Sequence, residues 1–196
     1  MGFLLMSYEY QRATRETSRH EAEQIRLDNQ VERLTKRIGK MESIFSKAKN
    51  QVNSNYQMLS QAASANLTTA IAGGTLAGLA RLVNSMVIGS DRMSNYVTVP
   101  TIPPDGVDEA AYVSQLGSSI RSYLDMMITR AKEAETEAIE DQEEMTLDPI
   151  NEKSADMEAQ ANIERQLFEL WKARRDKAEK QTGEDIKSQM GGYGLS

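Results

Sequence analysis

The chain has 196 residues, a net charge of −6 and no cysteine, which excludes disulfides, thiol catalysis and cysteine-ligated metals. Its single histidine excludes a histidine-based metal cluster. Three Phe, seven Tyr and one Trp are few large apolar anchors, and Ala and Met fill many of the apolar positions. This composition favours narrow helix–helix contacts over one thick globular core.

A heptad pattern dominates the first third of the chain. Apolar residues alternate at spacings of four and three, which is the a/d pattern of a helix that buries one stripe against another helix. The predicted seam residues are Leu27, Val31, Leu34, Ile38, Met41, Phe45, Val52 and Leu59, with Ala48 and Ala62 on the same register. We therefore predict a long helix over residues 1–66, whose seam is a helix–helix interface.

Two features qualify this long helix. Followed backward, the register meets polar residues, including His20, which lies among Arg19, Glu21 and Glu23 and is expected at the surface. Gly39 is an internal weak point that costs about 1 kcal/mol relative to Ala. The alternative is two ordinary helices with a break near Gly39 or Asn50.

A charge-poor middle segment and a Pro-rich connector follow over residues 67–107. From Asn50 to Ala80 there is no charged residue and no histidine, and Gly74 and Gly78 have the G-x-x-x-G spacing that permits close helix approach. We expect helices on both sides of a Gly-Gly bend, in a segment that is either buried or packed against another subunit, and we favour packing between subunits. The predicted interface residues are Ile71, Gly74, Leu76, Gly78, Leu82 and Val87.

A membrane span within residues 67–90 is the competing interpretation of this segment. It would make the chain a membrane-active, translocator-like protein. Thr75, Arg81 and Asn84 lie in the candidate window, however, and a central Arg costs about 2.5–3.5 kcal/mol on insertion. We therefore disfavour membrane insertion.

Two further helices are expected after the connector. The first, residues 108–147, begins with Asp108 as N-cap and becomes acidic. The second, residues 148–189, begins with Asp148 as cap and Pro149 at the first helical position, where its missing N–H costs nothing. Its apolar stripe is expected to contain Ile163, Leu167, Leu170, Trp171, Arg174 and Ala178.

The glycine-rich residues 190–196 are predicted to form a flexible tail. The complete pattern predicts an all-α fold, an elongated helical hairpin or coiled coil. It would consist of a long N-terminal helix, a middle rich in small residues and two further helices.

Charge is unevenly distributed along the chain. Residues 1–52 carry a net charge of +3, and residues 105–160 a net charge of −11. The favoured interpretation of the acidic block is a solvated helix face. The sharper alternative is that it lies beside the mildly basic N-terminal helix and attracts it, within one subunit or between neighbours. The acidic total and the absence of a concentrated basic stripe argue against nucleic-acid binding.

No motif in the chain predicts a reaction. The spacing from Gly73 to Gly78 is that of a phosphate-binding loop, but Leu79 and Ala80 replace the required Lys and Ser/Thr. The acidic run over residues 133–144 lacks the alternation and central glycine of a calcium loop. We expect no catalytic residue, no cofactor, no metal and no enzymatic activity.

In layout the chain resembles axial filament subunits exported by type III systems, which have coil-forming helices at both ends, a more variable middle and no cysteine. No flagellin or needle-protein signature segment is present. The sequence favours a non-enzymatic structural subunit that self-assembles through coiled-coil helices, as a filament or another oligomer. A coiled-coil adaptor that binds another helical protein is the alternative. The compartment is not determined, since cytoplasm and export without a cleaved signal peptide both fit.

Overall fold

The computed structural model describes the backbone of residues 2–192 and the side chains of residues 5–184, 186 and 187. Its elements in chain order are α1 (Gly2–Ala72), α2 (Leu76–Ser85), β1 (Val87–Ile88), β2 (Asp91–Arg92), η1 (Met93–Asn95) and α3 (Glu109–Gly192). The all-α prediction is confirmed, because α1 packs against α3 and the described strands hold only two residues each.

The first helix runs unbroken through both suspected weak points. α1 passes Gly39 and Asn50 and ends at Ala72, six residues beyond the predicted end. Gly39 is exposed, with open space where a side chain would lie. Gly39 therefore destabilises the helix only through the conformational entropy that its backbone loses on folding.

The predicted Gly-Gly bend is confirmed. Gly73 N–H donates to the Thr69 carbonyl, and Gly74 N–H donates to the Ile71 carbonyl. Gly74 has a φ of +64°, the left-handed conformation that ends helices and that side chains disfavour. α2 then begins at Leu76.

The predicted helix boundary at Asp148–Pro149 is wrong, because α3 continues through Pro149. A proline inside a helix removes the hydrogen bond to the carbonyl four residues earlier, here that of Met145, and costs about 3 kcal/mol. Met145, Asp148 and Pro149 are all exposed, so water can satisfy the freed carbonyl. Residues 190–192, predicted in the tail, also belong to α3, and residues 193–196 lie outside the described part of the chain.

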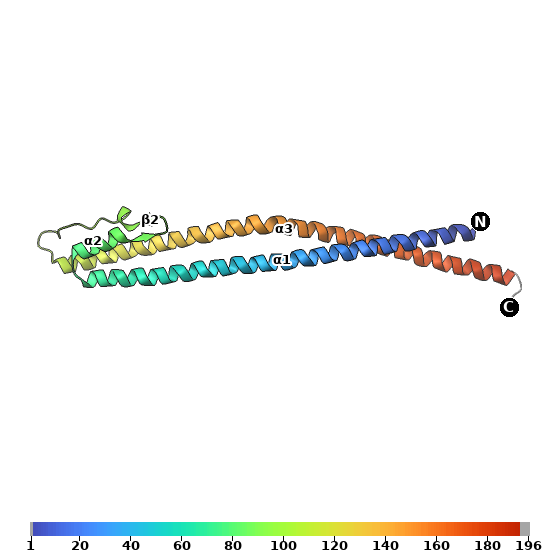
Figure 1. Cartoon of the computed structure of the whole chain (residues 1–196), viewed down its shortest axis with the longest axis horizontal. Coiled ribbons are helices and arrows are strands. Elements are labelled where there is room, and N and C mark those ends of the chain that lie inside the picture. Colours follow the sequence, from blue (N-terminus) through green and yellow to red (C-terminus); the bar gives the residue numbers. More distant parts are fainter. Residues whose placement is uncertain (1, 193–196) are drawn as a thin grey trace. The chain divides into compact units, whose positions relative to one another are not determined.

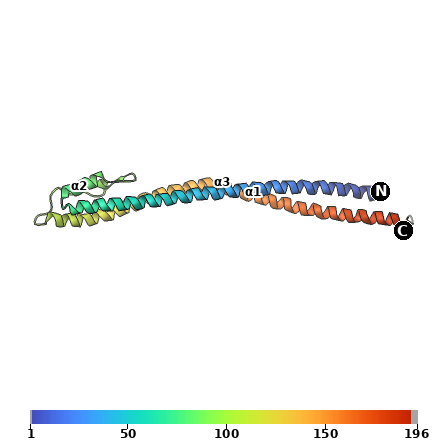
Figure 2. The same ribbon diagram turned by 60° about the horizontal axis from the view of Figure 1, so that its bottom comes forward.

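The chain divides into two compact units. Unit 1 comprises Met1–Met41 and Thr146–Ser196, and unit 2 comprises Glu42–Met145. Each unit contains a part of α1 antiparallel to a part of α3, and α2 lies beside both helices in unit 2 (Figures 1 and 2).

Unit 2 has a contiguous apolar core. α2 buries Leu76, Leu79 and Val83 between the long helices. The core residues are Ala63, Leu67, Leu76, Leu79, Val83, Met86, Ile88, Met93, Val113, Ile120, Leu124, Met127 and Ile128. The start of α2 is fixed by two polar contacts: Thr75 accepts from the Gly78 N–H, and Leu76 N–H donates to Glu109 at 2.8 Å.

A small hairpin in unit 2 was not predicted. β1 and β2 pair antiparallel, with Val87 opposite Arg92 and Ile88 opposite Asp91. Gly89, with a φ of +60°, begins the two-residue loop, as type II′ hairpin turns require. The strands are too short to give an alternation signal in the sequence, and Ile88 and Met93 anchor them in the core.

Candidate interaction surfaces

The predicted heptad seam faces inward in unit 1. On α1, Leu27 is 3% exposed, and Val31, Leu34, Ile38 and Met41 are half-buried. Part of α3 carries a matching stripe at spacings of three and four. Its buried or half-buried residues are Leu147, Ile150, Ser154, Met157, Ala161, Glu164, Phe168, Trp171, Arg175, Ala178 and Thr182. We call these two facing stripes the inner seam.

The register of α1 changes in unit 2. Phe45 and Leu59 are half-buried and Val52 is 4% exposed, as the heptads predict, but Ala62 is exposed while Ala63 is 6% exposed. The buried positions Val52 and Ala63 are thus eleven residues apart. Such a spacing corresponds to 3.67 residues per turn and removes the left-handed supercoil that strict heptads impose.

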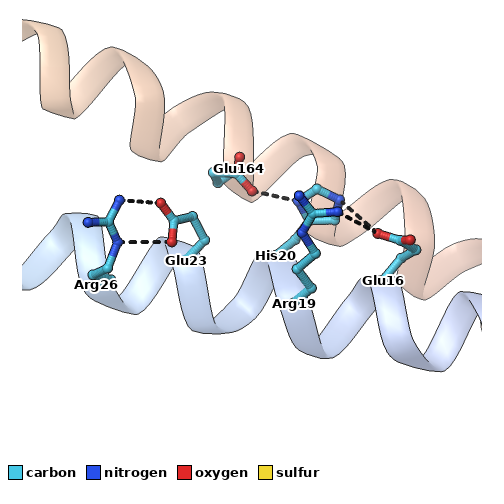
Figure 3. A network of polar contacts seen from close by, with 6 residues as sticks. All are labelled: Glu16, Arg19, His20, Glu23, Arg26 and Glu164. Atoms are coloured by element: carbon cyan, nitrogen blue, oxygen red, sulfur yellow. Dashed lines mark hydrogen bonds and ion pairs between the residues drawn. The ribbon is translucent and has the colours of Figure 1, made fainter.

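A polar pair interrupts the inner seam of unit 1. His20 of α1 lies at a d position and points at Glu164 of α3, with His20 Nδ1 2.5 Å from Glu164 Oε2 (Figure 3). The side chains of His20 and Glu164 are only 13% and 23% exposed. The prediction of a surface histidine was therefore wrong, because the heptad register overrides the polarity of the neighbouring residues.

The other contacts drawn in Figure 3 are local to α1. Glu16 lies 3.7 Å from Arg19 and 3.9 Å from His20, and Glu23 pairs with Arg26. The hydrogen bond from Arg26 lowers the pKa of Glu23. Exposed pairs within one helix contribute little to stability. Of the contacts drawn in this cluster, the His20–Glu164 contact is the one that joins α1 to α3.

Trp171, the single tryptophan, lies between two guanidinium groups. Arg12 of α1 lies 5.7 Å and Arg174 of α3 lies 4.9 Å from the ring centre. A cleft of about 270 Å³ adjoins this cluster. Its lining residues are Glu9, Arg12, Ala13, Trp171, Arg174, Lys177, Ala178 and Gln181. Trp171 was expected in the apolar stripe of the last helix, and its cation–π contacts with Arg12 of α1 and Arg174 of α3 make it an anchor within unit 1.

The acidic run meets α1 in unit 2. Lys49 Nζ lies 2.8 Å from Glu143 and 3.1 Å from Glu140, and these hydrogen bonds raise the pKa of Lys49. Burial, followed by a hydrogen bond with Glu135, raises the pKa of Tyr56. Part of the acidic block is thus paired with the basic N-terminal block inside one chain.

The residues of the predicted middle interface are largely used within unit 2. Leu76 is 1% exposed, and Leu82 packs against the core. Ile71 fills the space beside Gly117 of α3, where an added Cβ would lie 2.3 Å from Ile71 Cδ1.

The other predicted middle-interface positions are less enclosed. Gly74 and Gly78 lie at the turn and in the first turn of α2, whereas Val87 remains 52% exposed. The turn at Gly73–Gly74 folds α2 back onto its own chain, so this apolar surface does not require a neighbouring subunit.

A second stripe on α3 was missed by the sequence analysis. The expected stripe of the last helix mixed residues of two faces: Ala178 is buried, whereas Ile163 and Leu170 are 56% and 47% exposed. The exposed face repeats at spacings of four and three and spans an arc of about 100°. It consists of Glu152, Asp156, Ala159, Ile163, Gln166, Leu170, Ala173 and Lys177, all exposed, and we call it the outer stripe. The signal was present as a second heptad series in the same helix.

Comparisons of the chain with protein-family models, curated proteins and solved structures found no match. Among residues 2–192, no helix combines the length and apolarity needed to cross a bilayer. Within that same part of the chain, no group of three or more metal-ligating side chains is placed to hold an ion.

Proposed function

We propose that this chain is a non-enzymatic structural subunit that self-assembles through its coiled-coil helices. The observation that carries the proposal is the outer stripe of α3. The inner seam already occupies one face of this helix, yet Ile163 and Leu170 remain 56% and 47% exposed on another. A helix that is apolar on two faces is suited to two helical partners.

The outer stripe has the period that a coiled-coil contact requires. Its positions follow one another at four, three, four and three residues, so they stay on one side of the helix for seven turns. Ala159 and Ala173 flank the larger apolar residues and allow a second helix to approach closely. A filament or another oligomer arises if each subunit uses this stripe together with another surface.

An adaptor that holds a different helical protein would use the same stripe. The self-assembly reading is favoured because the stripe carries acidic residues at one end and Lys177 at the other, so a copy of the chain supplies a complementary surface.

Light scattering coupled to size-exclusion chromatography tests the proposal, over protein concentrations from about 1 to 100 μM, which detects association with a dissociation constant in the micromolar range. The wild type is expected to exceed the monomer mass of 21.9 kDa. Ile163→Asp and Leu170→Asp should return it to the monomer with helix content unchanged, since both residues are exposed. Ile102→Asp, at a 75% exposed isoleucine outside the helices, is the matched control.

Negative-stain microscopy of the same samples separates filaments from closed oligomers. A wild type that stays monomeric across this range contradicts self-assembly. A monomer that instead captures a helical partner through the outer stripe supports the adaptor.

A further inference from the structure

The outer stripe of α3 is complementary to itself when one copy is reversed. Its N-terminal end is acidic, with Glu152 and Asp156, its centre is apolar, and its C-terminal end is basic, with Lys177. Arg174 adds a second cation beside the same end. The eight positions also read with the same spacings in both directions, so reversal brings every position opposite another member of the stripe.

We infer that two copies of this chain pair antiparallel through the outer stripe, about a two-fold axis between Ile163 and Gln166. This inference rests on the proposed function and specifies its first contact. The pairing places Glu152 opposite Lys177 of the second copy and Ala159 opposite Leu170 of the second copy. Ile163 then lies opposite Gln166, close to the axis.

Charge selects this orientation over the parallel one. A parallel pairing in register would place Glu152 opposite Glu152 and Lys177 opposite Lys177, which costs free energy through like-charge repulsion. In the antiparallel arrangement the acidic end of each copy meets the basic end of the other, so this contact occurs twice, once on either side of the axis. Exposed ion pairs add little affinity but discriminate between alternative orientations.

The basic end is available for such a contact. Neither Arg174 nor Lys177 forms an ion pair with a carboxylate among the described side chains, although Arg174 stacks on Trp171 at 4.9 Å. The neighbouring Arg175, by contrast, is half-buried and pairs with Asp176 at 3.1 Å. Arg174 and Lys177 are both exposed, and they also line the cleft beside Trp171.

Size also matches: a large residue faces a small one across the contact. Leu170 of one copy lies over Ala159 of the other, and the same contact recurs on the opposite side of the axis. Alternating large and small residues lets the two helices interdigitate closely. Gln166 at the centre is a polar group that can hydrogen-bond its counterpart or water at the axis.

Cysteine cross-linking tests the orientation, because the natural chain contains no cysteine. Ala159→Cys chains are mixed with Leu170→Cys chains that carry a small mass tag, and the mixture is oxidised with copper phenanthroline. Antiparallel pairing predicts a disulfide between the two kinds of chain and little within either kind, since Cα atoms further apart than about 7 Å do not bridge. Ile102→Cys, at an exposed connector position, measures random collision.

The outcomes separate this inference from the proposed function. Cross-links between like Ala159→Cys chains would show parallel pairing, which overturns the orientation while self-assembly stands. An oligomer that forms neither cross-link would exclude the outer stripe as its interface. A monomer under all conditions would contradict the proposed function itself.

Charge reversal provides a second measurement. Glu152→Lys alone and Lys177→Glu alone should each weaken dimerisation about 5-fold or more, because each reverses two symmetric contacts. The double variant should regain wild-type affinity, since the reversed ends again match. A double variant weaker than either single variant would argue against the pairing of these two positions.

Discussion

The two units of the chain use the same two helices but bury different kinds of residue. Unit 2 encloses large side chains completely, with Leu67, Leu79, Ile120 and Leu124 at 0% exposure. Unit 1 fully buries mostly small or polar residues, such as Ala13, at 2%. Its larger seam residues stay half-buried, with Leu27 and Leu147 as the exceptions.

The difference comes from a third element. Two helices alone cover one another along a narrow line, so a large side chain at the edge of that line keeps contact with water. α2 and the hairpin cover this edge in unit 2, and among the described residues of unit 1 no such element covers it. A two-helix segment therefore leaves its larger seam residues partly exposed, whereas a segment with a third element encloses them.

The largest expected effect is in the core of unit 2. Leu79→Ala should reduce the free energy of unfolding of unit 2 by about 2–5 kcal/mol, because it leaves a cavity in an enclosed core. Amide hydrogen exchange of residues 42–145 under native conditions measures this loss. Val87→Ala, at a 52% exposed residue of the same unit, should change protection very little.

An equivalent truncation in unit 1 should cost less. Leu27→Ala removes a residue that is 3% exposed, but a two-helix interface can close partly around the gap, so we expect a loss of about 2 kcal/mol. The fluorescence of Trp171 during urea unfolding reports on this unit. A loss as large as that of Leu79→Ala would show that unit 1 is as enclosed as unit 2. Ile25→Ala, at 55% exposure, is the control.

The His20–Glu164 pair of unit 1 should contribute less to the free energy of unfolding than these core residues. A double-mutant cycle with His20→Ala and Glu164→Ala is expected to give a coupling energy of about 1–2 kcal/mol, since the partners are mostly buried and in direct contact. Urea unfolding of the four proteins supplies the values. Independent, additive effects would mean that the pair does not specify the alignment of α1 with α3.

The smallest effect concerns high pH in unit 2. The pKa values of Tyr56 and Lys49 are raised in the folded chain. Each protonated group therefore contributes to the free energy of unfolding below its unfolded pKa, which is about 10 for Tyr56 and about 10.4 for Lys49. This contribution is lost as the pH rises through the pKa of the folded chain. Tyr56→Phe should therefore remove part of the loss of stability above about pH 10. Thermal unfolding at pH 8 and pH 11 measures the difference, which should be unchanged in a Tyr8→Phe control, since Tyr8 is exposed.

Much of the fold follows from local sequence patterns. The heptads of α1 predicted the inward face of the helix from Leu27 to Val52, and the paired glycines predicted the turn before α2. These features depend on residues close together in the chain. The continuation of α3 through Pro149 did not follow, because it depends on whether the freed Met145 carbonyl can reach water.

The candidate surfaces were harder to predict because they depend on contacts between residues that are far apart in the chain. His20 occupies a seam position, but its partner Glu164 is 144 residues away. The choice between two heptad series in α3 likewise depends on which one α1 covers. Neither fact is contained in the local sequence of either helix.

The separation between His20 and Glu164 also has a consequence for synthesis of the chain. At about 5–20 residues per second, a ribosome needs roughly 7–29 s to add the 144 residues that separate them. During that interval the inner-seam face of α1 in unit 1 has no α3 to cover it. Nascent chains on one messenger therefore present the same uncovered stripe to each other, which exposes the α1 helices to premature pairing.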